Sequence, residues 1–428
     1  MRVSYVSCRR LRVGASMIPF VMLGIASAAQ AQAGSLASAA PDTVAATAPA
    51  ASAQDPSAHP ADQSATEAQA ANEAASGELL ITGRRRSELL RDAPLAVTSV
   101  SAPALAQQSI VSVTDLNRVA PNVILRQTNS GGGTVDAVIR GQSYAISNIA
   151  NDPPVGLYFD DVIVTQNKGA AVGIFDVSRI EVDRGVQGTL RGRNNTGGAI
   201  SIYTNRPELG KYSADVTATY GSRNYVQSQA VLNVPLGDTL AVRFGAQRII
   251  QDGWGHSIAS GQEYGGRDQW IARGQALFQP SSNISLNLLY EHVDIDQNPL
   301  GRRAIPGSGA YNALISGTLS GVNTSGLKLT PDQIIPSNFW NGSTGFIMPN
   351  DVAKADFVRG TLQVDLSSAA TFKLIGGYRK MSAFGGIDLD ATPALVLESN
   401  NGGTSHQFTV EPQFSGKLLG GKLNYGIG

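Results

Sequence analysis

Apolar and polar residues alternate along the chain from Lys211 onward. In residues 212–220, Tyr, Ala, Val, Ala and Tyr occupy every second position, and Ser, Asp, Thr and Thr lie between them. The same alternation returns in residues 240–247, 284–291 and 358–366. Because successive side chains of a β-strand point to opposite faces, this period of two predicts strands with one apolar and one polar face.

These strands have the pattern of a membrane β-barrel, since residues 212–220 also carry an aromatic residue at each end. Their polar faces would be prohibitive in lipid, so they must line a wet or protein-filled lumen. A soluble β-sandwich is the alternative that each strand alone permits. The connection lengths favour the barrel, because short turns alternate with longer loops.

The connections divide into two groups by length. Short turns are expected at residues 235–239, 280–283 and 367–370, which fit the inner rim. Longer loops, which fit the cell-surface rim, are expected at 252–267, 296–355 and about 384–404, with 221–224 as a short outer exception. About eight strands follow Lys211, and another begins at Lys422.

Before Lys211, residues 93–209 predict a compact α+β unit. Strands are expected at 95–100, 123–125, 135–140 and 155–159, with a turn at Asp160-Asp161. Ser101 is expected to cap a short helix that runs to Gln108, and Thr114 to cap another that runs to Val119.

Residues 176–207 predict a strand, a glycine-rich hinge and a second strand. Glycines let the backbone adopt positive φ or approach another element closely, and the hinge contains five of them: Gly185, Gly188, Gly192, Gly197 and Gly198. A phosphate-binding loop is the alternative, but such a loop opens a helix, whereas these glycines lead into the apolar strand 199–203. The pattern therefore favours a tightly packed hinge.

The amino-acid sequence of residues 176–207 closely resembles the end of the plug domain in TonB-dependent outer-membrane receptors. It reads DVSRIEVDRGVQGTLRGRNNTGGAISIYTNRP. NRVAPNV at 117–123, VIRG at 138–141 and PPVGLYFDDVIV at 153–164 also resemble plug wording. Two residues depart from the family pattern: Val186 replaces a usual proline, and Arg191 replaces a usual aromatic residue. The resemblance covers residues 77–207 and implies an α+β plug domain followed by an antiparallel transmembrane β-barrel.

The N-terminal residues 1–33 have the three parts of a secretory signal peptide: a basic head, an apolar middle and a small-residue cleavage site. A membrane anchor is the alternative, but the middle is short and contains Pro19. Cleavage would remove the only cysteine, Cys8, and four arginines, which lowers the basic count from 33 to 29 against 33 acidic residues. This composition argues against disulfides and nucleic-acid binding.

Residues 34–76 are rich in Ala, Pro, Ser and Gln and predict a disordered periplasmic leader. Residues 77–83 follow it and resemble a TonB box, with the expected TonB-binding residues Glu78, Leu79, Leu80, Ile81 and Thr82. A short strand beside a disordered arm can add to the edge of another protein's sheet. The alternative is that this segment is the first strand of the plug. The expected domains are thus completed by the plug at 84–209 and the barrel portion at 210–428.

The resemblance also implies that Arg140, Glu181 and Arg184 hold the plug against the barrel wall. Salt bridges within the plug are the alternative for these residues. Ligand is expected at the plug apex, in loops 126–133 and 141–151, although the contacting residues are unknown. The largest outer loop has a composition suited to a polar or ring-bearing ligand: Tyr311, Asn312, Asn323, Asn338, Phe339 and Trp340.

No catalytic or metal-binding constellation is found, because the histidines are scattered: His59, His256, His292 and His406. We therefore expect neither an enzyme nor a resident cofactor. The resemblance implies active import across the outer membrane, driven by TonB with ExbB and ExbD. A ferric siderophore is the commonest substrate of the family, and saccharides, cobalamin and aromatic compounds are alternatives.

A passive porin or surface-adhesion barrel is the alternative of another class, and it would need neither the TonB box nor the glycine hinge. Large plugged transporters have roughly 22 strands. Because far fewer strands are predicted here, we expect the chain to be the N-terminal portion of a longer receptor with an incomplete barrel.

Overall fold

The computed structural model describes residues 80–81, 88–89, 96–128, 133–143, 152–167, 169–170, 174–307, 312, 318–319, 322–323, 329–395 and 397–428. The predicted signal peptide and leader lie outside these residues. No helix in the described part of the chain has the length and apolar character that crossing a membrane requires.

The first described elements are two short strands, β1 (Leu80–Ile81) and β2 (Glu88–Leu89), which pair antiparallel. The predicted α+β domain follows. Its elements, in chain order, are β3 (Val97–Ser101), α2 (Ala102–Gln107), the 3-10 helix η2 (Val113–Arg118), β4 (Val123–Gln127), β5 (Val135–Ile139), β6 (Val155–Phe159), β7 (Val162–Val164), β8 (Val177–Arg184), α3 (Gly188–Arg191) and β9 (Gly198–Thr204). The prediction of an α+β unit is confirmed.

Five strands of this domain form one sheet in the order β3-β8-β9-β6-β7, while β4 and β5 form a separate hairpin. Only the β6–β9 pair is parallel among these described strands. The sheet buries a cluster of aliphatic side chains that includes Leu116, Ile139 and Ile180, each fully shielded from solvent. This apolar interior holds the hinge strands β8 and β9 in place.

The second predicted helix cap was wrong. Thr114 lies inside η2, and the residue that caps it is Ser112. Ser112 and Asp115 form a capping box, in which the Ser112 backbone N–H donates to the Asp115 carboxylate at 2.9 Å. A capping box also needs a side chain, three residues after the cap, that accepts a hydrogen bond from the backbone N–H of the cap. Asp115 provides this acceptor for Ser112, and it is missing for Thr114.

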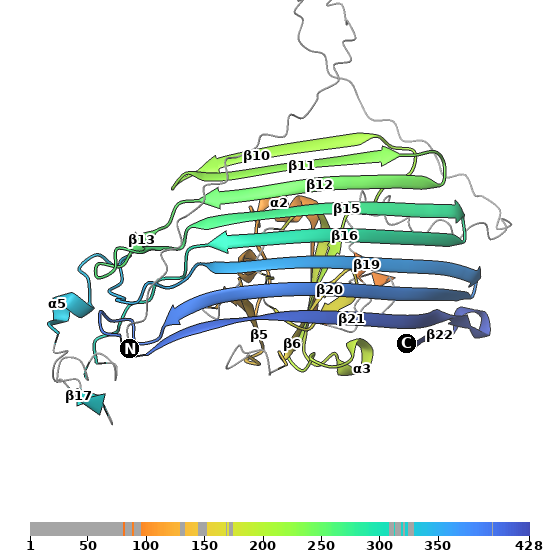
Figure 1. The fold of residues 1–428 in the computed structure, drawn as a ribbon. Coiled ribbons are helices and arrows are strands. Elements are labelled where there is room, and N and C mark those ends of the chain that lie inside the picture. The colour runs from red at the N-terminus through yellow and green to blue at the C-terminus, as the bar shows by residue number, and fades with distance from the viewer. Residues whose placement is uncertain are drawn as a thin grey trace, which may run out of the picture. The chain divides into compact units, whose positions relative to one another are not determined.

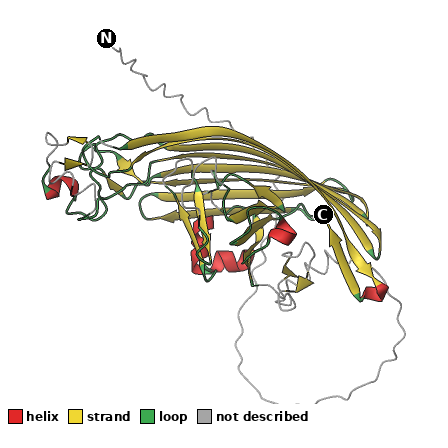
Figure 2. Cartoon of the chain, turned by 90° about the horizontal axis from the view of Figure 1, so that it is seen from below, coloured by secondary structure: helices red, strands yellow, loops and turns green. Residues whose placement is uncertain are grey.

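The remainder of the chain forms a nine-stranded antiparallel sheet in which sequence order is also spatial order (Figure 1). We call it the long sheet. Its strands are β10 (Ser213–Gly221), β11 (Tyr225–Pro235), β12 (Leu240–Gln251), β15 (Arg267–Ser281), β16 (Ile284–Gln297), β19 (Asp351–Ser367), β20 (Ala370–Asp388), β21 (Glu398–Leu418) and β22 (Leu423–Ile427). The predicted strands are confirmed, including the one after Lys422. Figure 2 shows the strands as a curved and twisted sheet.

The predicted short turns all lie at one end of the long sheet. At the other end lie the longer connections, with β13 (Gly255–His256), β14 (Glu263–Tyr264), β17 (Thr318–Leu319), β18 (Val322–Asn323) and α5 (Pro331–Ile334) (Figure 1). The predicted loop at 384–404 was too long, because β20 continues to Asp388 and β21 begins at Glu398. Its glycines and asparagines are typical of loops, but ladder hydrogen bonds join backbone atoms and tolerate them.

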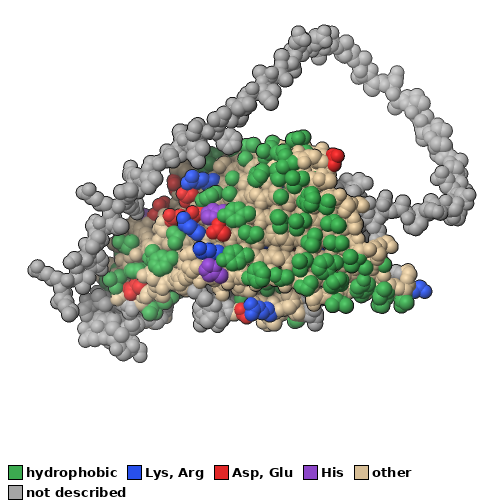
Figure 3. Space-filling view, turned by 45° about the vertical axis from the view of Figure 1, so that its right-hand side comes forward, with side chains coloured by type: hydrophobic (Ala, Val, Ile, Leu, Met, Phe, Trp, Pro, Cys, Tyr) green, Lys and Arg blue, Asp and Glu red, His purple; other side chains and the backbone are tan. Residues whose placement is uncertain are grey.

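One row of cross-strand neighbours marks the boundary of the outward apolar surface. Phe244, Tyr290, Tyr378 and Phe408 lie in the same row, and all four side chains are exposed. Two residues further toward the long loops, the neighbouring row contains His292, Asp356, Lys380 and His406. Figure 3 shows the apolar side chains beside a band of charged and histidine side chains. An apolar face that ends in an aromatic row is typical of a barrel wall at a lipid–water interface.

Candidate functional site

The glycine hinge is built around backbone conformations that larger residues avoid. Gly185, Gly192 and Gly198 have φ values of 107°, 77° and 154°. At Gly198 the requirement is also steric, because an added Cβ would lie 2.2 Å from the Asp183 carbonyl oxygen. Gly198 therefore lets β9 pair tightly with β8.

The other two hinge glycines differ from each other. A Cβ at Gly197 would lie 2.8 Å from the Cβ of Gln142, so close packing requires glycine there. Gly188 was wrongly assigned to the same group, since its φ is ordinary and an added Cβ would meet nothing within 4 Å. Gly188 instead begins the short helix α3, which the glycine-rich wording did not predict.

Arg191 is buried inside the α+β domain. Its Nη2 lies 2.7 Å from the Asp183 carboxylate, and its Nη1 donates to the Ser201 hydroxyl at 2.8 Å. The guanidinium carbon also lies 5.1 Å from the centroid of the Tyr158 ring. Burial raises the pKa of the Asp183 carboxyl, an effect that the Arg191 charge opposes. The charge that replaces the usual aromatic residue thus packs on a ring and neutralises a buried carboxylate.

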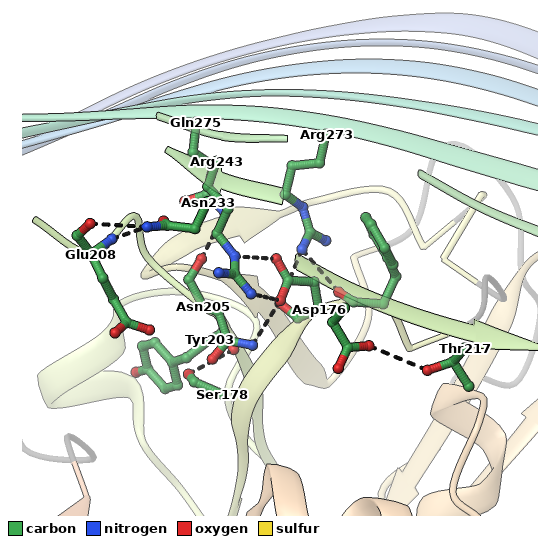
Figure 4. Close-up of polar contacts among 12 residues, drawn as sticks. Asp176, Ser178, Tyr203, Asn205, Glu208, Thr217, Asn233, Arg243, Arg273 and Gln275 are labelled. Atoms are coloured by element: carbon green, nitrogen blue, oxygen red, sulfur yellow. Dashed lines mark hydrogen bonds and ion pairs between the residues drawn. The ribbon is translucent and has the colours of Figure 1, made fainter. Parts of the chain in front are cut away.

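The α+β domain meets the inner face of the long sheet through Asp176, just before β8 (Figure 4). The Asp176 carboxylate accepts two hydrogen bonds from Arg243 of β12, with Nη2 at 2.6 Å and Nε at 2.8 Å. Arg273 of β15 donates from Nη1 to the Phe175 carbonyl at 2.9 Å. The bidentate contact between Arg243 and Asp176 fixes the orientation of the two groups as well as attracting them.

A second group of contacts lies at the β6–β7 turn, where the predicted turn residues Asp160 and Asp161 both have positive φ. Asp160 lies 2.9 Å from Nη1 of Arg359, and Asp161 lies 2.8 Å from Nζ of Lys373. Burial would raise the pKa of Asp161, but the Lys373 ammonium beside it holds that pKa below its usual range. Asp161 is therefore an anion whose position depends on the long sheet.

The long sheet contributes its own carboxylate to this network. Glu291 of β16 lies 2.6 Å from Nη2 of Arg273 and 3.6 Å from Nη2 of Arg359. All three side chains are nearly shielded from solvent. Glu291 thus partly balances the two guanidinium groups that contact the α+β domain, which lowers the cost of burying them.

Hydrogen bonds to uncharged acceptors extend the same interface. Gln407 of β21 accepts from the Thr165 hydroxyl at 2.9 Å, and Gln275 of β15 donates to the Asn205 carbonyl at 2.8 Å. Arg379 of β20 donates to the Gln166 carbonyl at 3.1 Å. These bonds add polar contacts to the ion pairs between the α+β domain and the long sheet.

The residues predicted to hold the two parts together make contacts inside the α+β domain. Glu181 is 2.8 Å from Nε of Arg179, and Arg184 donates to the carbonyls of Ala96 and Pro121, all within the α+β domain. The Arg140 guanidinium covers Gly185: a Cβ added at Gly185 would lie 2.8 Å from Nη1 of Arg140. Their role against the barrel stays a prediction. The described ion pairs across the interface instead join carboxylates of the domain to bases of the sheet.

The predicted TonB box is described only in part. Leu80 and Ile81 form β1, whose backbone pairs with Leu89 and Glu88. Glu78, Leu79 and Thr82 lie outside the described residues, as do parts of both predicted apex loops. The box assignment stays a prediction.

Comparisons with known proteins agree on one class. Residues 89–199 match the TonB-dependent Receptor Plug Domain. The chain is 31% identical to the pesticin receptor of Yersinia pestis over 164 residues, which cover 38% of this chain and 24% of that protein. It is 25% identical to the catecholate siderophore receptor Fiu of Escherichia coli K12 over 243 residues, which cover 56% of this chain and 30% of Fiu.

A solved structure has the same fold. The ferric yersiniabactin uptake receptor FyuA of Yersinia pestis aligns with a TM-score of 0.59 at 20% identity, over 75% of this chain and 45% of that one. The chain therefore spans less than half the length of the relatives it matches.

Proposed function

Because the chain belongs to the TonB-dependent outer-membrane receptors, we propose that it serves TonB-dependent import of a ferric siderophore across the outer membrane. In this family the α+β domain is the plug and the long sheet is part of the barrel wall. The outer membrane is the chain's location. A signal peptide at 1–33, a leader at 34–76, a TonB box at 77–83, a plug at 84–209 and a barrel portion at 210–428 belong to this proposal.

The observation that carries the proposal is the interface between the α+β domain and the long sheet. Asp160, Asp161 and Asp176 are each ion-paired with a base of the sheet. Separating the most shielded of these pairs, Arg243–Asp176, leaves uncompensated charges and costs roughly 3–5 kcal/mol, whereas the partly exposed Lys373–Asp161 pair contributes about 1 kcal/mol. A domain held this way blocks passive flow and moves only when work is done on it, which disfavours a passive porin or adhesion barrel.

No nucleoside triphosphate is available at the outer membrane. The energy for moving the domain must therefore come from elsewhere in the cell. TonB, energised by ExbB and ExbD, is the proposed source, and Leu80 with its neighbours is the proposed point of attachment. The relatives support the cargo, since they include receptors for catecholate siderophores and for ferric yersiniabactin. Saccharides, cobalamin and aromatic compounds are the alternative cargoes for the same mechanism.

The test is to replace Leu80 by proline in the full-length receptor. Proline removes a backbone donor and fixes φ, so added-strand pairing with TonB fails. We expect uptake of radiolabelled ferric siderophore to be lost while binding at the cell surface persists. Leu80→Val is the matched control, because it keeps the donor and suits a strand. Normal uptake by Leu80→Pro at normal surface expression would remove the box assignment.

A further inference from the structure

A pocket of about 430 Å³ opens among the long connections of the long sheet. The connection between β12 and β15 contributes Trp254 and Tyr264, and the connection between β16 and β19 contributes residues 301–306 and 339–342. This volume suits one small ligand group. The pocket lies away from the ion pairs between the α+β domain and the sheet.

The frame of the pocket is tightly packed. Tyr264 is fully buried, and its hydroxyl hydrogen-bonds Thr344 across the two connections. A Cβ at Gly301 would lie 2.2 Å from the Tyr264 ring, so only glycine allows this approach. Backbone bonds also cross, since Gly342 N donates to the His256 carbonyl at 3.1 Å. A pocket framed in this way is preformed, which lowers the entropic cost of binding.

Besides the buried Tyr264, three aromatic rings line the pocket: Trp254, Phe339 and Trp340. The Trp254 and Trp340 centroids are 6.1 Å apart, and those of Phe339 and Trp340 are 5.4 Å apart, both pairs edge to face. Phe339 is 73% exposed and Trp340 57% exposed. Large rings held in place yet open to water indicate a surface that receives another flat ring.

Two arginines border the same space. Arg303 is occupied, because it donates to the carbonyls of Pro336 at 2.8 Å and Asn338 at 3.0 Å. Arg302 is half-buried and is attracted to Asp388, yet it makes no ion-pair contact or side-chain hydrogen bond with the described residues. Its burial lowers the pKa of its guanidinium, but arginine remains charged at physiological pH. Arg302 therefore offers donors to an anionic group in the pocket.

We infer that this pocket binds a planar aromatic group that carries a negative charge. The rings select a flat ligand, and Arg302 selects an anion. Among the described residues that line the pocket there is no carboxylate, which disfavours a cation. That this group is part of the imported cargo rests on the proposed function, whereas the binding itself does not.

The binding test uses the purified chain in detergent micelles and three probes. Benzoate has both features, cyclohexanecarboxylate has the charge without the flat ring, and benzyl alcohol has the ring without the charge. The chain has three tryptophans, two of which line the pocket, so intrinsic fluorescence reports occupancy. We expect benzoate to quench with at least tenfold higher affinity than either other probe. Equal affinities for the three probes, or no quenching, would overturn the inference.

Two substitutions assign the charge. Arg302→Gln should weaken benzoate binding at least tenfold without changing the affinity for benzyl alcohol, and Arg302→Lys should restore part of the loss. Arg248→Gln is the control, since Arg248 is an exposed arginine paired with Asp268 elsewhere on the sheet. Unchanged benzoate affinity in Arg302→Gln, at native circular dichroism, would also overturn the inference. Because the assay lacks TonB, benzoate binding together with failed uptake would count against the proposed import alone.

Discussion

The α+β domain and the long sheet solve opposite problems with the same residue types. The domain buries aliphatic side chains such as Ile139 and Ile180 and keeps polar groups at its rim or in internal pairs. The long sheet exposes apolar side chains such as Val216 and Leu288 and turns polar ones inward. The difference shows that the surrounding medium, water or lipid, decides which face is apolar, and that the two polar faces then meet each other.

The two regions also differ in how much depends on a single residue. The sheet rests on a repeated alternation, so any one position contributes little beyond its own burial. The domain rests on particular positions such as Gly198 and Arg191, whose neighbours are already in contact. Substitutions that probe this difference should therefore have their largest effects in the domain.

The largest effect is expected for Gly198→Val. The new side chain meets the Asp183 carbonyl and should displace β9, at a cost of about 4 kcal/mol or more. We expect antibiotic leakage through the barrel and faster proteolysis of the domain. Gly188→Ala is the control, because its Cβ has open space. Wild-type impermeability with normal transport in Gly198→Val would count against a packed hinge.

Arg191→Met should be next. It leaves Asp183 buried without its partner, which costs roughly 3–5 kcal/mol. The midpoint temperature of thermal unfolding of the purified chain should fall markedly. Adding Asp183→Leu should recover most of that loss, since both charges are then gone. A double variant no more stable than Arg191→Met would show that packing on Tyr158, rather than the ion pair, holds Arg191 in place.

Leu288→Arg tests the outward face of the sheet. Leu288 is half-exposed on the apolar side, where an added charge costs roughly 2–4 kcal/mol near the middle of a bilayer. Asn287→Arg, one residue earlier and on the opposite face, should cost less because it enters the polar lumen. Unfolding in lipid vesicles measures both. Equal losses would contradict the assignment of inner and outer faces.

The smallest effect concerns acid. The pKa of Asp161 is lower in the folded protein than in the unfolded chain. Its pair with Lys373 therefore stabilises the interface fully at pH values above the ordinary Asp pKa of about 4. That contribution, about 1 kcal/mol, should fade as pH falls from there toward the lowered pKa. Protease protection of the interface should therefore survive pH 5 and decline below about pH 4. Asp161→Asn should remove this step, and an identical pH profile in that variant would exclude Asp161 as its cause.

Much of the fold follows from local pattern. Strand alternation in residues 212–220 and the glycines at 185, 192 and 198 predicted their own structure, because both depend on neighbouring residues. Other features depend on partners distant in sequence. The Arg243–Asp176 pair joins residues far apart in the chain, and the alternation of β12 says only that Arg243 faces inward.

The same limit explains the outer pocket. The composition of the largest outer loop suggested ring-bearing ligands, but Trp254 and Tyr264 come from a different connection. Their meeting with Trp340 depends on backbone bonds between the loops, which no local pattern records. Gly301 could not serve as a clue either, because a glycine there has meaning only once the Tyr264 ring is known to lie against it.

On the proposed function, the polarity of the interface has a consequence for what passes through the barrel. Arg243, Arg359 and Lys373 face inward with aspartates of the domain as counter-ions. Displacement of the domain takes those aspartates away, which leaves Arg243 and Lys373 without these counter-ions, whereas Arg359 keeps Glu291 at 3.6 Å. In the proposed receptor such a cationic wall would act as an anion exchanger: a passing anion takes the place of a departed carboxylate, and the returning domain displaces that anion.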